Sequence, residues 1–469
     1  MRRRLIFLVM LLALLSGLTL AFSPVARAET RSAQIPTACI NASQTNTLTG
    51  NIGGANYLIE VPSNWNGTLV LYSHGYVFPG NPLTAQDAGD PLTEAALLQQ
   101  GYALAGSSYS QNGWALQQAF HDQIALLNFF NATCGHPSRT IAWGHSLGGI
   151  ITAGLVQLNP NRFAGALPMC GVLAGGIGTW NQALDGAFAF DVLLAGNALP
   201  IVHLPADPTT AFNQAEGVLQ SAQNTAQGKA RIALIAALGD IPGWFTTGSP
   251  EPANTDFTAQ EVNQFDWESQ IDFLFAYFAR AELEARAGGN PSWNTGVNYH
   301  DQLADSASNR EVQALYKQAG LNLNKDLNAL NAAPRISADP GAVSYLNKYI
   351  SFDGDVNIPV LTMHTTGDGL VVNQDEQAYA TIVRQRGDAS LLRQTYVQRA
   401  GHCAFTPAET LTAFQTLINR LNTGKWADTT DPGLMNTEAA ALGSTLNTAP
   451  PAFIQFQPTM FLRPFFKRD

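Results

Sequence analysis

The sequence predicts an α/β protein in which a mostly parallel β-sheet is covered by helices on both faces. Short apolar runs typical of buried strands alternate with helical stretches over residues 47–172, and the alternation resumes near residue 356. Such alternation is the pattern of βαβ units, which build parallel sheets. Residues 173–355 interrupt it with a helix-rich stretch that carries four tryptophans. We therefore expect one α/β core with a large helical insertion.

Each element follows from local patterning. The expected strands are short and apolar: 57–61, 67–73, 102–107, 139–143, 165–172, 359–363 and 391–398. The expected helices have apolar residues at helical spacing: 93–99, 115–130, 150–157, 269–287, 309–319, 339–349 and 407–421. This gives a core of residues 29–172 and 356–425 and a helical cap of residues 173–355. The tail, 426–469, resembles a loop, but its many Phe and Leu residues predict that it packs back on the body.

The N-terminus has the features of a secretory signal peptide. Three arginines (Arg2–Arg4) precede an apolar run (Leu5–Leu20), and the small residues of Ala26–Ala28 provide a cleavage site. An uncleaved membrane anchor is the alternative, but the run is slightly shorter than the ~20 residues that span a bilayer. We predict a signal peptide over residues 1–28 and an extracellular protein that begins at Glu29.

Composition excludes several functional classes. The chain has 469 residues, of which 46% are hydrophobic and 13% charged, and its net charge is −10. The predicted signal carries four arginines and no acidic residue, so the mature chain has a net charge of −14. A negative surface argues against nucleic acid as a partner. The high apolar content argues against disorder. No second run of about 20 apolar residues follows the signal, so no stable membrane insertion is expected.

Four cysteines are compatible with two disulfides in an exported protein. Cys39, Cys134, Cys170 and Cys403 allow three connectivities, and their spacing fits no zinc or redox motif. We predict no metal and no organic cofactor.

The motif that carries chemistry is Gly144-His145-Ser146-Leu147-Gly148, which fits G-x-S-x-G. An expected strand precedes it and an expected helix follows it. In that setting the serine stands on a tight turn that only small neighbours permit, and its hydroxyl projects above the sheet. We predict that Ser146 is a nucleophile.

A serine hydroxyl needs a base to take its proton and a carboxylate to hold that base. In a G-x-S-x-G protein of this kind the chain order is serine, acid, histidine. Asp368 follows the strand at 359–363, and His402 follows the strand at 391–398. These two complete the predicted triad. Asp375, one helical turn later, is the alternative acid, and His364 at the strand end is a candidate supporting residue.

An oxyanion hole requires two backbone N–H donors. The residue after the nucleophile, Leu147, supplies one. The second is expected from the loop after the strand at 67–73, where His74 and Gly75 precede Tyr76. Gly75 allows close approach of the backbone, so the N–H of Tyr76 is the candidate.

With these elements in order, the chain resembles the α/β-hydrolase fold superfamily over residues 57–172 and 358–421. The resemblance implies a mostly parallel eight-stranded sheet, a Ser-Asp-His triad and a lid inserted after the sixth strand. The His402–Cys403 pair is similar to that of tannase- and feruloyl-esterase-like enzymes, in which a second cysteine precedes the nucleophile and pairs with it. Here His145 fills that position, so the chain departs from the pattern.

Another partner for Cys403 is therefore needed. Cys170 ends the strand after the nucleophile helix, at the same edge of the sheet. We favour a Cys170–Cys403 bridge that anchors the His402 loop, which leaves Cys39 to pair with Cys134.

These features predict a secreted serine hydrolase that cleaves a carboxylic ester, acting on a small molecule or a polymer. A serine peptidase or aminopeptidase of the same fold is the alternative. It would need an acidic pocket in the cap for the substrate amine, and the candidate residues are Asp185, Glu261, Asp266 and Glu268. A non-catalytic binding protein on this scaffold is a third reading, although it would normally have lost a triad member. The oligomeric state is left open.

Overall fold

A nine-stranded sheet forms the centre of the protein. The computed structural model describes residues 39, 41, 43–426 and 430–466, so the predicted signal peptide lies outside the described residues. The strands are β1 (Asn46–Ile52), β2 (Ala55–Val61), β3 (Thr68–Ser73), β4 (Ala103–Ser107), β5 (Arg139–His145), β6 (Gly165–Met169), β7 (Val360–Gly367), β8 (Leu392–Ala400) and β9 (Phe453–Ile454). Their spatial order is β1-β2-β4-β3-β5-β6-β7-β8-β9.

The sheet is parallel from β4 through β8 and antiparallel at both ends. The pairs β4–β3, β3–β5, β5–β6, β6–β7 and β7–β8 are parallel, whereas β1–β2, β2–β4 and β8–β9 are antiparallel. The central strands β3, β4, β6 and β7 are buried along their whole length, as expected where helices cover both faces. The resemblance implied eight strands. The ninth is the two-residue β9, which the tail adds along the edge of β8.

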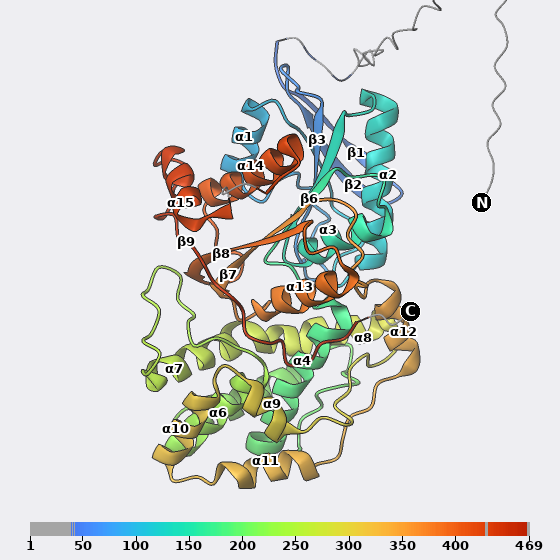
Figure 1. The fold of residues 1–469 in the computed structure, drawn as a ribbon. Coiled ribbons are helices and arrows are strands. Elements are labelled where there is room, and N and C mark those ends of the chain that lie inside the picture. The colour runs from blue at the N-terminus through green and yellow to red at the C-terminus, as the bar shows by residue number, and fades with distance from the viewer. Residues whose placement is uncertain (1–38, 40, 42, 427–429, 467–469) are drawn as a thin grey trace, which may run out of the picture. The chain divides into compact units, whose positions relative to one another are not determined.

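Helices cover the two faces of the sheet (Figure 1). On one face α2 (Leu116–Cys134) and α3 (Leu147–Leu158) pack together, and on the other α1 (Pro91–Gln99) packs with α14 (Pro407–Thr423). Helix α13 (Gln374–Arg386) connects β7 to β8. Trp143 of β5, buried between the helices, has no exposed surface. The carboxyl ends of β5, β7 and β8 therefore meet at one edge of a rigid core, and the loops that follow them are held there.

The residues between β6 and β7, which we call the helical insertion (173–355), are helical with no strand among them. The insertion contains α4 (Gly175–Phe190), η1 (Asp191–Ala195), α5 (Thr209–Ala222), α6 (Ala226–Leu238), α7 (Phe257–Trp267), η2 (Glu268–Asp272), η3 (Phe275–Ala279), α8 (Arg280–Ala287), α9 (Tyr299–Asp305), α10 (Asn309–Ala319), α11 (Leu323–Ala332) and α12 (Pro340–Lys348). The segments written η are π-helical. The helix expected at 269–287 is part of a longer helical run that begins at Phe257 and contains two such turns.

The tail is more ordered than the expected loop. It contains the helix α15 (Pro432–Ala441) as well as β9. Phe461 is fully buried, and its N–H donates to the side chain of Gln377 at 3.0 Å. Arg463 forms an ion pair with the buried Asp185 of α4. The tail therefore packs on both the core and the insertion. Among the described residues, no helix combines the length and apolar character needed to cross a membrane.

Candidate active site

Ser146 occupies a strained turn between β5 and α3. Its backbone has φ of 59° and ψ of −124°, a combination that non-glycine residues adopt at a cost. The turn can form only because its neighbours are small. A Cβ atom at Gly144 or at Gly148 would overlap the carbonyl oxygen of Ser73 in the adjacent strand. These contacts explain the glycine spacing of the motif and hold Ser146 above the end of β5.

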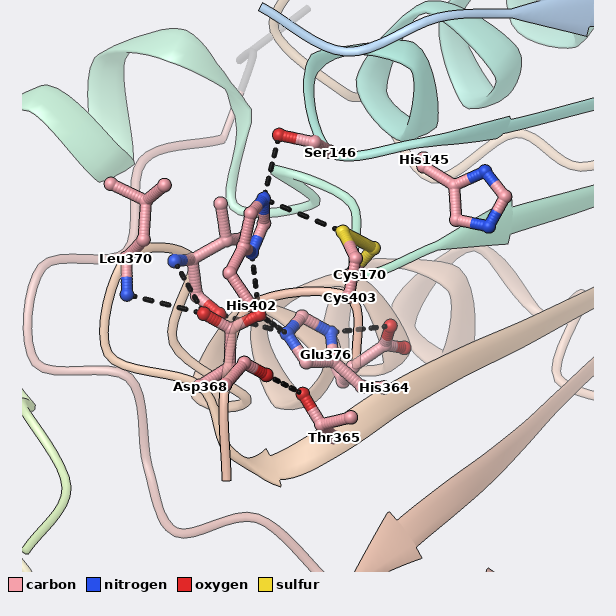
Figure 2. The surroundings of a disulfide bond; sticks show 12 residues. His145, Ser146, Cys170, His364, Thr365, Asp368, Leu370, Glu376, His402 and Cys403 are labelled. Atoms are coloured by element: carbon pink, nitrogen blue, oxygen red, sulfur yellow. Dashed lines mark hydrogen bonds and ion pairs between the residues drawn. A yellow bond between two sulfur atoms is a disulfide. The ribbon is translucent and has the colours of Figure 1, made fainter. Parts of the chain in front are cut away.

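The structure brings the three predicted triad residues together from loops far apart in the chain (Figure 2). The Nε2 atom of His402 lies 2.8 Å from Oγ of Ser146, and its Nδ1 atom lies 2.7 Å from Oδ2 of Asp368. Ser146 follows β5, Asp368 follows β7 and His402 follows β8. The alternative acid, Asp375, lies on α13, where it accepts a weak hydrogen bond from Thr179. The geometry is that of a nucleophile, a base and an orienting carboxylate.

The Asp368 carboxylate is held in place by the loop that carries it. Its Oδ1 atom accepts hydrogen bonds from the N–H groups of Leu370 and Val371, both at 3.1 Å. Burial by itself would raise the pKa of Asp368, but His402 and His364 outweigh it and hold the pKa below its usual value. The carboxylate therefore stays ionised where it contacts His402, which favours the tautomer of His402 that leaves Nε2 free to accept a proton.

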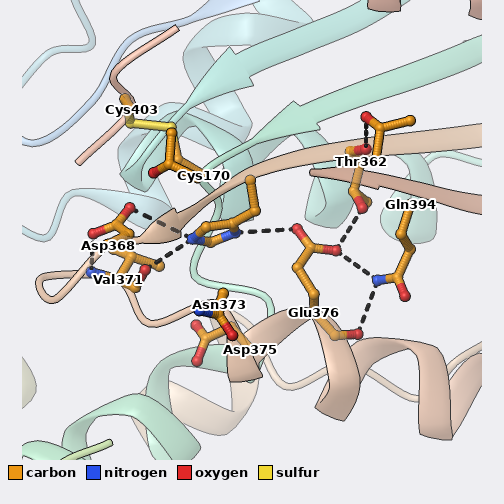
Figure 3. Close-up of polar contacts among 12 residues, drawn as sticks. Cys170, Thr362, Asp368, Val371, Asn373, Asp375, Glu376, Gln394 and Cys403 are labelled. Carbon is orange, nitrogen blue, oxygen red and sulfur yellow. Dashed lines mark hydrogen bonds and ion pairs between the residues drawn. A yellow bond between two sulfur atoms is a disulfide. The ribbon is translucent and has the colours of Figure 1, made fainter. Parts of the chain in front are cut away.

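Behind Asp368 lies a second histidine that is fully buried. Nε2 of His364 lies 3.5 Å from Oδ2 of Asp368, and its Nδ1 lies 3.2 Å from Oε1 of Glu376. Burial lowers the pKa of His364, but the contacts with the two carboxylates outweigh it and raise the pKa to about 10. The Glu376 carboxylate also accepts from Thr362 and from Gln394 (Figure 3). His364 thus lies between two buried carboxyl groups, those of Asp368 and Glu376.

Sequence reasoning identified His364 as a candidate supporting residue but missed Glu376. Glu376 stands in the first turn of α13, where acidic residues are common and usually face solvent. No spacing in the sequence distinguishes it from such a residue. Only the packing of α13 against β7 and β8 makes it a partner of the site.

The loop after β3 lies against the turn that carries Ser146. A Cβ atom at Gly75 would stand 3.3 Å from Cβ of Ser146 and 3.7 Å from its Oγ. His74 stacks on the Tyr109 ring with 4.1 Å between centroids, and the hydroxyl of Tyr109 donates to the His74 carbonyl at 3.1 Å. Of the two predicted oxyanion residues, Leu147 directly follows Ser146 in the chain, and Tyr76 directly follows Gly75, which lies against Ser146. The sequence placed His74 in this loop, but it did not single out Tyr109, whose ring and hydroxyl contact His74.

The Cys170–Cys403 disulfide joins the loop after β6 to the loop of His402. The second bridge links Cys39 to Cys134. These are the two pairings that the sequence favoured. Sγ of Cys403 lies 3.4 Å from Nε2 of His402, so the bridge directly adjoins this imidazole ring (Figure 2). His145 is half-buried beside β3, where the hydroxyl of Tyr72 lies 3.1 Å from its Nδ1.

Known proteins that are similar to this chain include an amidase and two esterases. No family model matches the chain. An o-phthalyl amidase of Xanthobacter agilis is 29% identical over 417 residues, which cover 83% of this chain and 89% of that protein. The crystal structure of feruloyl esterase B from Aspergillus oryzae covers 84% of this chain and 85% of its own, with 15% identity and a TM-score of 0.37. An esterase structure from the same organism covers 83% of each chain, with 14% identity and a TM-score of 0.38.

Proposed function

We propose that this chain, a hydrolase with the α/β-hydrolase fold, cleaves carboxylic esters through an acyl-enzyme on Ser146. The observation that carries the proposal is the hydrogen-bonded series Ser146–His402–Asp368, with separations of 2.8 and 2.7 Å. A serine attached to a base that is itself oriented by a carboxylate is the arrangement that activates a hydroxyl for attack on a carbonyl carbon.

The steps of the reaction follow from this arrangement. Oγ of Ser146 attacks the ester carbonyl while Nε2 of His402 takes its proton, and the resulting imidazolium is stabilised by Asp368. The N–H groups of Leu147 and Tyr76 stabilise the oxyanion. Removing one such donor usually lowers kcat by a factor of about 10²–10³. His402 then protonates the departing alkoxide. Water, deprotonated by His402, attacks the acyl group and releases the acid and free Ser146.

The first test is active-site labelling. A fluorophosphonate should label the wild-type protein on Ser146. Ser146→Ala should not be labelled, and its kcat for p-nitrophenyl acetate should be lower by a factor of about 10⁴–10⁶. Ser138→Ala is the matched control, because Ser138 is an exposed serine whose hydroxyl donates to the carbonyl of Gly67. Equal labelling of wild type and Ser146→Ala would contradict the proposal and favour a non-catalytic binding protein on this scaffold.

Amide cleavage is the second candidate, and the likeness to an o-phthalyl amidase favours it. The same three residues serve either substrate, because the acyl-enzyme is common to both and only the leaving group differs. A matched pair with one acyl group, p-nitrophenyl acetate and p-nitroacetanilide, separates the two. An amidase should cleave the anilide with a kcat/KM within about 10²-fold of the ester, whereas an esterase should show a far larger gap, since amine departure depends on protonation by His402.

We also propose that the protein is exported and that residues 173–355 act as a cap over the site. Two disulfides support export, because such bonds persist mainly in oxidising compartments. N-terminal sequencing of the protein from the culture medium should begin at Glu29. The cap assignment is supported by Phe275 of the insertion, whose ring lies 5.5 Å from those of Tyr76 and Phe78 in the loop beside Ser146.

A further inference from the structure

A cavity of about 110 Å³ lies inside the helical insertion and reaches the loop of Asp368. Its walls come from α4, from η2 and η3, and from Gly369 and Leu370, the two residues that follow Asp368. Most of the lining is apolar, including Phe190, Ile201, Ile235, Phe273, Phe275 and Tyr277. The volume is several times what one water molecule needs, so the cavity has room for a small organic group.

Two carboxylates from one π-helical turn line this apolar cavity. Glu268 is 2% exposed, and both of its carboxylate oxygens are buried with no hydrogen-bond partner among the described residues. Asp272, four residues later, has a buried and equally unpartnered Oδ2 atom. Leaving buried acceptors unpaired is costly, and π-helical turns recur at functional sites. These atoms therefore indicate a ligand that donates hydrogen bonds.

The charged groups around Glu268 indicate the sign of the charge that this ligand carries. The charged groups that act on it are the acids Asp272, Glu261 and Glu216. Burial raises the pKa of Glu268 well above its usual value, and the repulsion from these acids raises it further. The pKa of Asp272 is raised well above its usual value in the same way, mainly by burial and also by the charge of Asp368. A cation between the two carboxylates would relieve the repulsion and supply the missing donors.

The other acidic candidates of the insertion do not offer this arrangement. Asp185 is paired with Arg463 of the tail, and Tyr299 and Gln302 also donate to it. Asp266 accepts from Gln270 and does not line the cavity. Of the four acids that the sequence singled out for a substrate amine, Glu268 is the one that lines this cavity.

The cavity adjoins the proposed reaction centre on two sides. Leu370, whose N–H group donates to the Asp368 carboxylate, is part of its wall. Phe275, also part of the wall, packs against Tyr76 of the proposed oxyanion loop at 5.5 Å between ring centroids. A group bound in the cavity could therefore belong to a substrate whose carbonyl lies at Ser146.

We propose that this cavity is a substrate subsite for an ammonium group on a short apolar arm, with Glu268 and Asp272 as its acceptors. The inference rests on the proposed hydrolase function and deepens it by naming the substrate class as amine-bearing acyl compounds. An ammonium carries three N–H donors and no acceptor, which matches the unpaired oxygens. The aromatic and aliphatic walls suit the arm and add cation–π attraction.

Binding is tested first, with no requirement for catalysis. The full-length Ser146→Ala protein is heated with benzylammonium, benzyl alcohol or benzoate, three probes of one shape and different charge. We expect the Tm to rise with benzylammonium only. This rise should disappear when Glu268→Gln or Asp272→Asn is combined with Ser146→Ala, and it should remain when Asp266→Asn is combined with Ser146→Ala. A rise with benzoate, or an equal rise with all three, would overturn the inference.

Turnover is tested next with methyl 6-aminohexanoate and methyl heptanoate, in which an ammonium group replaces a methyl group. The wild type should favour the amine by about tenfold or more in kcat/KM, as expected for hydrogen bonds to a charged group. Glu268→Gln should remove the preference by lowering kcat/KM for the amine. Asp266→Asn, which lies outside the cavity, should leave kcat/KM for both esters unchanged. If heptanoate is cleaved with no preference for the amine, the subsite is refuted and the hydrolase stands. If benzylammonium binds but no ester or amide is cleaved, the hydrolase is refuted and the cation site stands.

Discussion

Removing the Cys170–Cys403 bridge should lower stability and activity together. The change is a double substitution, Cys170→Ser with Cys403→Ser, which leaves no reactive thiol beside His402. The bridge joins residues 233 apart in sequence. In the chain-entropy description, its loss lowers the free energy of unfolding by about 5.5 kcal/mol at 25 °C. That is a large part of the total of about 5–15 kcal/mol that is typical of a folded protein.

The other disulfide supplies a matched control. The Cys39–Cys134 bridge joins residues 95 apart, so its removal should lower the free energy of unfolding by about 4.7 kcal/mol. Cys134 precedes β5, at the end of that strand opposite to Ser146. The two double-serine variants should therefore lose similar stability, while only the first loosens the loop that positions the base.

The assay combines urea unfolding with kcat for p-nitrophenyl acetate, at a temperature where circular dichroism finds both variants folded. Cys170→Ser/Cys403→Ser should lose about 10- to 100-fold in kcat, because a displacement of about 1 Å at a catalytic group can cost 10²-fold. Cys39→Ser/Cys134→Ser should keep its kcat. Equal kcat in the two folded variants would refute the reasoning that the bridge positions His402.

Two further predictions concern the supports of the site. Gly148→Ala should destabilise the protein by about 1–3 kcal/mol and reduce kcat, since its Cβ would overlap the Ser73 carbonyl. Gly217→Ala, where an added Cβ meets nothing within 4 Å, should instead stabilise α5, and calorimetry compares the two. Protonated His364 stabilises the fold fully below its usual pKa of about 6.5, and this contribution is lost as pH rises through about 10. The Tm of the wild type should therefore decrease as the pH rises between those two values, and this decrease should be smaller in Glu376→Gln. An equal decrease in both proteins would argue that His364 is neutral.

Several features of the site could be predicted from the sequence because each depends on a short stretch of chain. The glycines around Ser146 are required by the turn itself, whatever the rest of the protein does. Asp368 and His402 each follow a stretch that is predicted to be a strand, and parallel strands present their carboxyl ends at one edge. Their convergence was therefore expected, and the separations of 2.7 and 2.8 Å agree with it.

Other features could not be predicted, because they depend on contacts between segments distant in sequence. The tail looked like a loop, yet Phe453 and Ile454 pair with β8 and α15 precedes them. A two-residue strand carries too little pattern to be recognised, and its pairing exists only because the edge of β8 is there to receive it.

The sequence by itself predicted the parallel part of the sheet, the chain order of Ser146, Asp368 and His402, and the glycine turn around Ser146, since strand patterning and glycine sterics act over a few residues. The tertiary structure alone decided the surroundings of two further acids. Glu376 and Glu268 both stand on helices, where an acidic residue is ordinarily solvated, and nothing local distinguishes them. Packing buried the first against His364 and turned the second, unpaired, into an apolar cavity. A carboxylate's energy depends on what surrounds it in space, and that is decided only when the chain is folded.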